Sequence, residues 1–423
     1  MTPTPAQFEQ MVLVMREVLR FEHPADRVLR HYFQRNPSLG QRDRGLIAET
    51  VFATLRRLLW LRWVAEDDAV NARRLLALSL QRLQGLSART LEPLLKAADR
   101  DWLASRQGRD APPDSVAADL PDWAWQRLVA ERGADWVRDF GRALQQPAPL
   151  DLRVNVHKLK REAALEALAA TGIEATPTPL SPIGIRLANK VTLQNHPLFQ
   201  DGSVEVQDEG SQLLGLLVGA KRGDRVGDFC AGAGGKTLLL AAQMRDSGQV
   251  YAFDVSEKRL AQFSPRLKRA GVSNVQPQRI EDENDPKLAK LTAKLNRVLV
   301  DAPCSGFGTL RRNPDLKCRQ SEAALAELTA KQGRILDAAA RLVQPGGVLV
   351  YGTCSPLADE NRAIVDAFLA AHPEFSIDPA GAALTAQGAT LPDSLNNAEM
   401  LQLSPHEHGT DGFFGARLLR RKE

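Results

Sequence analysis

The chain has 423 residues, of which 43% are hydrophobic and 25% are charged, so it is long enough to bury more than one core and two or three domains are expected. Its formal net charge is only +4, so a polyanionic partner would have to be met by local clusters of basic residues. No run approaches the ~20 apolar residues of a membrane span, and the first residues lack the basic and apolar segments of a secretion signal; we therefore expect a cytoplasmic protein with no membrane association.

Residues 1–119 have the pattern of a helical domain. Apolar residues recur at helical spacing between Val12 and Leu19, and again between Leu46 and Leu58. Two interpretations of its arginines are equally favoured: solvated helix faces, or a surface for RNA phosphates. The arginines that stand out are Arg42, Arg44, Arg56, Arg57, Arg62, Arg73 and Arg74.

A smaller α+β module is predicted over residues 120–202. It begins with helical patterns and continues with a strand at 150–155, a helix at 161–170 and a short strand at 184–187. Arg153 alternates with Leu152 and Val154, so its side chain should lie on the opposite face of the strand. An exposed strand charge is the commoner explanation of such an arginine, and a nucleic-acid contact is the other.

The third part, residues 203–423, opens with a strand, a glycine loop and a helix. The strand is Val226–Phe229, the loop is Cys230–Thr237, and the helix is Leu238–Met244. Glycines let the backbone approach a ligand closely, and the amides at a helix start can bind its polar groups. A Walker loop would need glycine where Cys230 stands, and a dinucleotide fingerprint would need glycine where Thr237 stands. The loop therefore belongs to another class of ligand.

The next strand, Gln249–Phe253, ends in Asp254, which lies 19 positions after Gly235. An acidic residue at this place is suited to bind the diol of a ribose, which would imply a bound adenosine. Alternatively, Asp254 caps the following helix, because Asp254–Glu257 resembles a capping box. The two interpretations are equal for this residue alone, and the glycine loop adds weight to the ligand.

Two further apolar runs end close to a cysteine. Arg297–Val300 leads to Asp301 and Cys304, and Gly347–Tyr351 leads to Cys354, with a predicted helix at 322–342 between them. Parallel strands end at one edge of a sheet, so the two thiols should face one crevice, where a thiolate could act as a nucleophile. A free cysteine is usually a small buried apolar residue, but the shared position at strand ends argues against that explanation here.

The remaining cysteines, Cys230 and Cys318, are interpreted as packing or loop residues. The four cysteines show no C-x-x-C pair and no zinc spacing, so no metal site is predicted. Near the end of the chain, Asp411 and Gly412 precede an apolar strand, which predicts a terminal antiparallel hairpin.

These motifs, taken together, resemble the RNA cytosine-5 methyltransferases that use S-adenosylmethionine. The segments that carry the resemblance are, in chain order, Asp151–Asn155, Val206–Ser211, Gly234–Thr237, Asp254, Asp301–Gly306, Arg311–Asp315, Thr353–Ser355 and Asp411–Phe414. The helical domain is similar to the antiterminator-type RNA-binding domain of the bacterial small-subunit rRNA methyltransferase B branch, mainly through Leu39-Gly40 and Asp43-Arg44.

The resemblance implies an α/β fold in which a Rossmann-like methyltransferase domain, residues 203–423, follows the α+β RNA-recognition module and the all-α domain. It implies S-adenosylmethionine as the cofactor, RNA as the partner and a monomeric protein. The cofactor-binding residues that it implies are Cys230, Ala231, Gly232, Ala233, Gly234, Gly235, Lys236, Asp254, Arg259, Asp282 and Asp301.

Carbon 5 of cytosine is too electron-poor to take a methyl group directly, so a nucleophile must first add to carbon 6. By resemblance, Cys354 is the nucleophile, Cys304 helps to release the adduct and Asp301 binds the edge of the base. Lys236 would orient Cys354 or the base, or serve the loop structurally. The chemistry of the sequence does not choose between the thiols, because DNA cytosine methyltransferases use the cysteine of a Pro-Cys pair, which here is Cys304.

Two departures from the family pattern concern the cofactor. Ala233 stands where the family has proline, so the loop loses a fixed φ and is expected to be looser in the free enzyme. The acidic residue after the third strand is out of register, and Asp282 is favoured over Glu281.

The target base must be unpaired or flipped, which favours a structured RNA loop as substrate. Its phosphates could be held by the basic residues after Cys304, namely Arg311, Arg312, Lys317 and Arg319. Small-subunit rRNA is the expected substrate. The alternatives are a tRNA, or an RNA-binding or ribosome-assembly protein that keeps the fold without catalysis.

Overall fold

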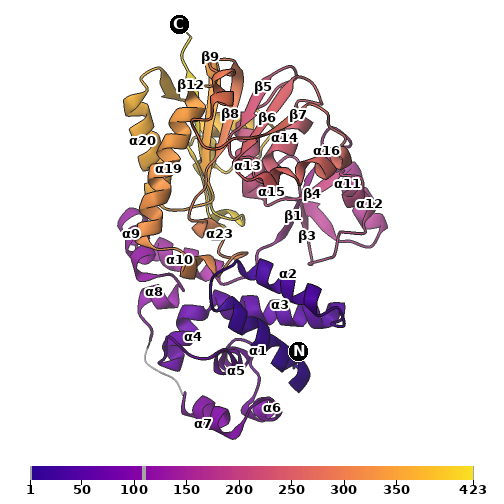
Figure 1. Cartoon of the computed structure of the whole chain (residues 1–423), viewed down its shortest axis with the longest axis vertical. Coiled ribbons are helices and arrows are strands. Elements are labelled where there is room, and N and C mark those ends of the chain that lie inside the picture. The colour runs from indigo at the N-terminus through magenta and orange to yellow at the C-terminus, as the bar shows by residue number, and fades with distance from the viewer. Residues whose placement is uncertain (1, 107–110, 423) are drawn as a thin grey trace. The chain divides into compact units, whose positions relative to one another are not determined.

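The structure, a computed structural model of the chain, describes residues 2–106 and 111–422. It divides into two compact units (Figure 1). Unit 1 comprises residues 1–147 together with 309–322, and unit 2 comprises residues 148–308 together with 323–423. The predicted domain boundaries at residues 119 and 202 stay a prediction.

Unit 1 is helical in all of its described regular structure. Its first helix, α1, starts in a capping box in which the Thr4 hydroxyl accepts from the Gln7 amide and the Gln7 side chain accepts from the Thr4 amide. Phe8, Met11 and Met15 of this helix are fully buried. The helices are α1 (Pro5–Val18), α2 (Ala25–Arg35), α3 (Gln41–Arg56), α4 (Leu58–Ala65), α5 (Ala72–Arg82), α6 (Ala88–Leu91), η1 (Glu92–Leu94), α7 (Ala97–Ser105), α8 (Asp114–Ala117), α9 (Asp122–Arg132) and α10 (Ala134–Leu144).

The segment 309–322, which contains α18 (Leu316–Arg319), belongs to unit 1 although its sequence lies in the predicted methyltransferase domain. Lys317 is 4% exposed, and its Nζ donates to Oδ1 of Asp119 and to the carbonyl of Arg56. The Ala25 amide donates to Asp315. The prediction that Lys317 holds RNA phosphates is therefore wrong, because its charge is buried and already paired.

Unit 2 contains a small antiparallel sheet in the order β2-β3-β1-β4. Leu152, Val154 and Ile185 point to one face, where they pack with Leu168 of α11 (Arg161–Ala170). This sheet confirms the predicted strands and helix of the α+β region. Its strands are β1 (Leu150–Val154), β2 (Ala175–Pro177), β3 (Gly184–Leu187) and β4 (Val204–Val206).

The large sheet of unit 2 has the order β10-β12-β9-β8-β5-β6-β7. The five strands from β9 to β7 are parallel, whereas β12 pairs antiparallel with β9, β10 and β11. The predicted parallel βα order and the terminal antiparallel hairpin are both confirmed. The strands are β5 (Arg225–Asp228), β6 (Gln249–Asp254), β7 (Val275–Arg279), β8 (Leu295–Asp301), β9 (Val343–Thr353), β10 (Phe375–Ile377), β11 (Leu401–Leu403) and β12 (Phe413–Arg420).

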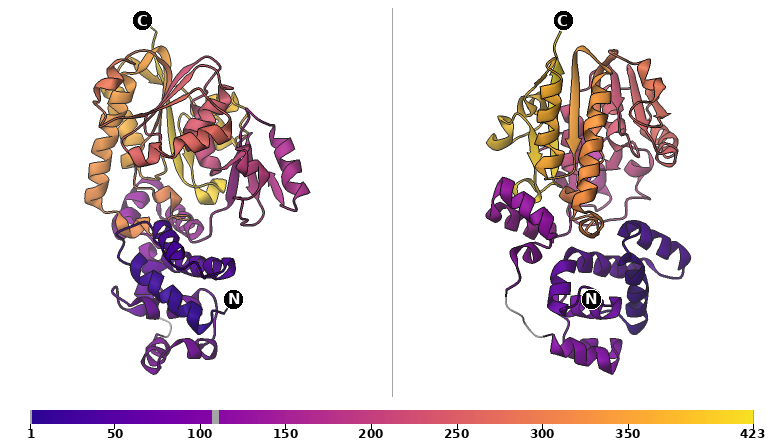
Figure 2. Two further views of the ribbon diagram at one scale, coloured as in Figure 1. Left: turned by 45° about the vertical axis from the view of Figure 1, so that its right-hand side comes forward. Right: turned by 60° about the vertical axis from the view of Figure 1, so that its left-hand side comes forward.

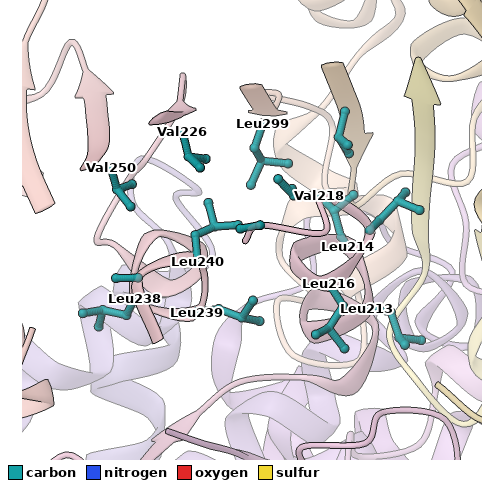
Figure 3. Packing of buried hydrophobic residues seen from close by; sticks show 14 of the residues in the cluster. Leu213, Leu214, Leu216, Val218, Val226, Leu238, Leu239, Leu240, Val250 and Leu299 are labelled. Carbon is teal, nitrogen blue, oxygen red and sulfur yellow. The ribbon is translucent and has the colours of Figure 1, made fainter. Parts of the chain in front are cut away.

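Helices cover both faces of this sheet. Helices α13 (Glu209–Leu217) and α14 (Gly235–Gln243) pack their leucines against Val226, Val250 and Leu299 (Figure 3). On the other face lie α19 (Glu322–Ala340) and α20 (Arg362–Ala371), which come forward in the right-hand view of Figure 2. The fold is thus the Rossmann-like α/β arrangement that was predicted, and the carboxyl ends of β5, β6, β8 and β9 meet at one edge.

Short helices occupy the connections of unit 2. They are α12 (Pro197–Gln200), α15 (Glu257–Leu260), α16 (Phe263–Ala270), α17 (Pro286–Ala289), η2 (Phe307–Thr309), η3 (Ala358–Glu360), α21 (Ala380–Thr385), α22 (Asp393–Asn396) and α23 (Pro405–His408).

Candidate active site

The glycine loop leads from β5 into α14. Gly234 is the N-cap of α14 and has φ +85°, a conformation that favours glycine. A Cβ at Gly234 would also lie 3.0 Å from the ring of Phe263. The loop is tied to the second strand by a 2.8 Å hydrogen bond from the Gly232 amide to Oδ2 of Asp254.

Asp254 stabilises the loop and does not form the suggested capping box. Its Oδ1 accepts from the Ser256 amide at 2.7 Å, and the N-cap of α15 is Ser256, whose hydroxyl accepts from the Arg259 amide. Asp254 is buried, yet it lines a cavity at the carboxyl edge of the sheet. The helix-cap interpretation is therefore wrong, and the carboxylate faces the place predicted for a ligand.

This cavity has a volume of about 520 Å³, within the usual range for a small-molecule site. Its lining combines apolar side chains that could enclose a purine with the carboxylates of Asp254 and Asp301, so it fits the adenosine and polar groups of S-adenosylmethionine. The lining residues are Phe229, Cys230, Gly232, Asp254, Val255, Ser256, Arg259, Ile280, Glu283, Asp301, Pro303, Lys331 and Ile335.

Five of the residues predicted to bind the cofactor line this cavity: Cys230, Gly232, Asp254, Arg259 and Asp301. The other predicted residues, which are not in its lining, are Ala231, Ala233, Gly234, Gly235, Lys236 and Asp282. Burial raises the pKa of the Cys230 thiol, so this cysteine stays neutral.

Asp282 lies away from the cavity. Its side chain is exposed, and its Oδ1 accepts from the Asn284 amide at 2.7 Å. Glu283 lines the cavity in its place and bonds Arg334 at 2.7 Å, which holds the pKa of the Glu283 carboxyl below its usual value. Sequence reasoning did not identify Glu283. Three acidic residues follow one another at positions 281–283, and the sequence does not show which of them faces the cavity.

The two strand-end cysteines do meet, with Sγ of Cys304 3.4 Å from Sγ of Cys354. The pKa of Cys304 is raised well above its usual value, first by its hydrogen bond to Cys354 and then by burial and the charge of Cys354. Cys304 thus holds its proton and can donate it to the sulfur of Cys354.

Lys236 lies near Cys354 and is paired with Asp301. Its Nζ bonds Oδ2 of Asp301 at 2.7 Å and lies 5.5 Å from the centre of the Phe413 ring. Burial would lower the pKa of Lys236, but the negative charges of Asp301 and Cys354 outweigh burial and raise it. The lysine therefore stays cationic, and it and a thiolate at Cys354 stabilise each other.

Two backbone hydrogen bonds fix the cysteine loops to one another. The Gly308 amide donates to the carbonyl of Cys354 at 2.9 Å, and the Gly412 amide donates to the carbonyl of Gly308 at 2.8 Å. A Cβ at Gly308 would lie only 2.1 Å from the Gly412 oxygen, so this clasp requires glycine.

Behind the clasp is a buried carboxylate that the sequence did not single out. Glu360 is fully buried and accepts from the Ser305 amide at 2.8 Å, from the Ser305 hydroxyl and from Gln332. It braces the loop that carries Cys304. No local pattern marks Glu360, because its partners lie 28 and 55 residues away.

Across residues 2–106 and 111–422, no group of three or more histidine, cysteine or acidic residues is arranged to hold a metal ion. In the same part of the chain, every helix is too short or too polar to cross a membrane.

Comparison with known proteins gives two matches to family models. Residues 216–419 match the model described as 16S rRNA methyltransferase RsmB/F, and residues 120–194 match the ferredoxin-like domain of RsmF/B-like methyltransferases. The probable ribosomal RNA small subunit methyltransferase B of a Synechocystis strain is 30% identical over 96% of this chain and 97% of its own length. The probable methyltransferase B of Bacillus subtilis strain 168 is 28% identical over 89% of this chain and 90% of its own length.

Solved structures show the same fold. The structure named PH0851 has a TM-score of 0.81 and 25% identity, and the match covers 99% of both chains. NSun6 from Pyrococcus horikoshii, solved with the S-adenosylmethionine analogue SFG, has a TM-score of 0.62 and 19% identity over 72% of this chain and 99% of its own.

Proposed function

Because the chain belongs to the RsmB/F family of 16S rRNA methyltransferases and is an RNA methyltransferase that uses S-adenosylmethionine, we propose that it methylates carbon 5 of a cytosine in small-subunit rRNA through a covalent adduct. The observation that carries the proposal is the 3.4 Å approach of the Cys304 and Cys354 sulfurs beside Asp301 and Lys236. Methylation at carbon 5 requires a nucleophile that adds to carbon 6 and a neighbouring acid–base group that removes the proton from carbon 5.

In the proposed reaction, the Cys354 thiolate adds to carbon 6 of the cytosine and so makes carbon 5 nucleophilic. Cys354 is assigned as the nucleophile from the family resemblance, and the 3.4 Å contact between the sulfurs supports Cys304 as the group that exchanges protons beside it. Bound S-adenosylmethionine supplies an electrophilic methyl group. Asp301, which lines the cavity, would bind the base edge, with Lys236 holding its carboxylate in place.

Release follows from the same pair. When Cys354 has formed a thioether, the negative charge and the hydrogen-bond acceptor that raise the pKa of Cys304 are lost. Cys304 can then release its own proton to solvent, and the thiolate that remains can accept the proton that carbon 5 must lose. The C6–S bond breaks, the double bond reforms, and Cys354 leaves as the thiolate.

The cofactor site of the proposal is the cavity beside the glycine loop. Asp254 would hold the ribose diol and Ile280 and Val255 would flank the adenine, since these are the acidic and apolar parts of the lining. The other predicted residues in the lining of this cofactor site are Cys230, Gly232 and Arg259. The remaining residues of the glycine loop would set its backbone shape.

Separate replacement of the two cysteines tests the mechanism. Purified Cys304→Ala, incubated with S-adenosylmethionine and small-subunit rRNA, should accumulate a protein–RNA adduct that survives denaturing electrophoresis. Cys354→Ala should form none. If the adduct appears in Cys354→Ala and is missing in Cys304→Ala, the two roles are exchanged.

The substrate is tested in cells. Mass spectrometry of a strain that lacks the gene should show the loss of one 5-methylcytidine from small-subunit rRNA. Loss from a tRNA would identify a tRNA enzyme instead, and unchanged rRNA and tRNA together with no methyl transfer from labelled S-adenosylmethionine would identify a protein without catalysis.

A further inference from the structure

Two arginines hold carbonyl oxygens of the glycine loop on either side of Gly234. Nη1 of Arg153 donates to the carbonyl of Gly235 and, at 2.6 Å, to Oε1 of Gln207. Nη1 of Arg266, in α16, donates to the carbonyl of Ala233. Charged donors therefore anchor the peptide group between Ala233 and Gly234, a residue with positive φ, and the peptide group between Gly235 and Lys236.

One anchor, Arg153, lies in the small sheet, and the other, Arg266 of α16, is bonded to a residue of that sheet. Arg153 in β1 and Glu205 in β4 are directly opposite one another in the ladder, and they are only 2% and 5% exposed. Oε2 of Glu205 accepts from Nη2 of Arg266 at 2.9 Å, and Oε1 accepts from Arg269. Glu205 thus aims Arg266 at the loop.

The charges of this cluster persist at neutral pH. Burial would raise the pKa of Glu205, but Arg266, Arg269 and Arg153 outweigh burial and lower it. Burial lowers the pKa of Arg153 to about 10, which still leaves it charged. The expectation of an exposed strand charge at Arg153 is wrong. The arginine is buried, the charge of Glu205 faces it, and its two hydrogen bonds go to neutral oxygens, one of them the carbonyl of Gly235 in the glycine loop.

The two arginine bonds act on loop residues that lie beside the proposed reaction site. A peptide group is planar, so the Gly235 carbonyl and the Lys236 amide move together, and Arg153 fixes the backbone from which Lys236 reaches Asp301. On the other side of Gly234, Ala233 has no ring to fix its φ. The Arg266 bond restrains the same residue by its carbonyl.

We infer that Arg153 and Arg266 are positioning residues that hold the glycine loop in its binding conformation before the cofactor arrives. The Glu205-supported arginine restrains the peptide plane that follows Ala233, whereas a proline at position 233 would restrain the φ of that residue. A loop already ordered spends less binding free energy on its own ordering. The inference rests on the proposed assignment of the cavity and loop to S-adenosylmethionine.

The chain offers a matched control for Arg266. Arg269 lies in the same helix, has the same 24% side-chain exposure and bonds the same Glu205, but Arg266 is the one of the two that bonds a loop carbonyl. Arg266→Gln should weaken S-adenosylmethionine binding in calorimetry about tenfold, the effect of losing a charged hydrogen bond. It should also speed amide exchange of residues 230–238 in the free protein, and Arg269→Gln should change each value less than twofold.

Equal affinity and equal exchange in Arg266→Gln and Arg269→Gln would overturn the inference. Arg153→Lys keeps the positive charge but loses the guanidinium donors, so it should show faster amide exchange at residues 235–237. Unchanged exchange would show that Arg153 does not hold the loop. A wild-type protein that binds no S-adenosylmethionine would contradict the proposed function, whereas amide exchange of residues 230–238 in the free protein tests the two anchors separately.

Discussion

At the scale of single residues, the buried carboxyl of Asp228 stands directly behind the glycine loop, at the end of β5. Its Oδ2 accepts from the Thr237 hydroxyl at 2.6 Å, while its Oδ1 is buried without a hydrogen-bond partner. Burial, followed by the nearby charges of Asp301 and Asp254, raises the pKa of Asp228 from 3.8 to about 7. The neutral form is thus the one that the fold favours.

The stability of the protein should therefore fall as the pH rises through that range. A carboxyl with a raised pKa in the folded state contributes fully below about pH 4, and its contribution is lost as the pH passes about 7. Asp228→Asn should remove this loss and be more stable than wild type at pH 8 by on the order of 3 kcal/mol. Denaturant unfolding of both proteins from pH 4 to pH 8 checks this, and a difference that does not change with pH would contradict it.

At the scale of structural elements, the Gly308 clasp joins the loop after β8 to those after β9 and before β12. Gly308→Ala should force these backbones apart, because the added Cβ would lie 2.1 Å from the Gly412 oxygen and 2.8 Å from the Cys354 oxygen. We expect a loss of about 2–4 kcal/mol in the free energy of unfolding and a fall in kcat from the displaced Cys354.

Gly333 in α19 supplies the control. A Cβ at Gly333 would meet nothing within 4 Å, so Gly333→Ala should stabilise the helix by about 1 kcal/mol and leave activity unchanged. Equal unfolding midpoints for the two variants would show that the clasp tolerates a side chain.

Periodicity and turn residues predicted the elements of unit 2 well. The helix at 161–170 and the strand at 184–187 have the bounds that were predicted, and the glycine loop and both cysteines lie where the strand ends place them. Arg153 was placed on the correct face but taken as exposed, because alternation along a strand identifies a face and says nothing of what covers it. Asp282 shows the same limit, since a register shift of one residue separates an exposed acid from one in the cavity.

At the scale of the whole molecule, the segment 309–322 could not have been assigned from its sequence. Basic residues after a catalytic motif are typical of a phosphate-binding loop, and only the three-dimensional structure shows that Lys317 is buried against Asp119. Which core a segment joins depends on contacts across 198 residues of sequence, which no local pattern records.

Lys317→Ala should destabilise unit 1 by about 3 kcal/mol, because it leaves the 2% exposed Asp119 without its buried partner. The matched control is Glu322→Gln, which removes an exposed pair with Arg127 in the same unit and should cost less than about 1 kcal/mol. Thermal unfolding followed by circular dichroism measures both, and similar melting temperatures would mean that the buried pair adds little.

The long sequence separation of Asp119 and Lys317 also delays the completion of unit 1 while the protein is being synthesised. At the usual rates of synthesis, about 5–20 residues per second, the 198 residues between them take roughly 10–40 s to translate. During that interval the helical unit has emerged from the ribosome but lacks the segment that completes it. The nascent chain must therefore wait for much of the second unit to be synthesised before its first unit can close.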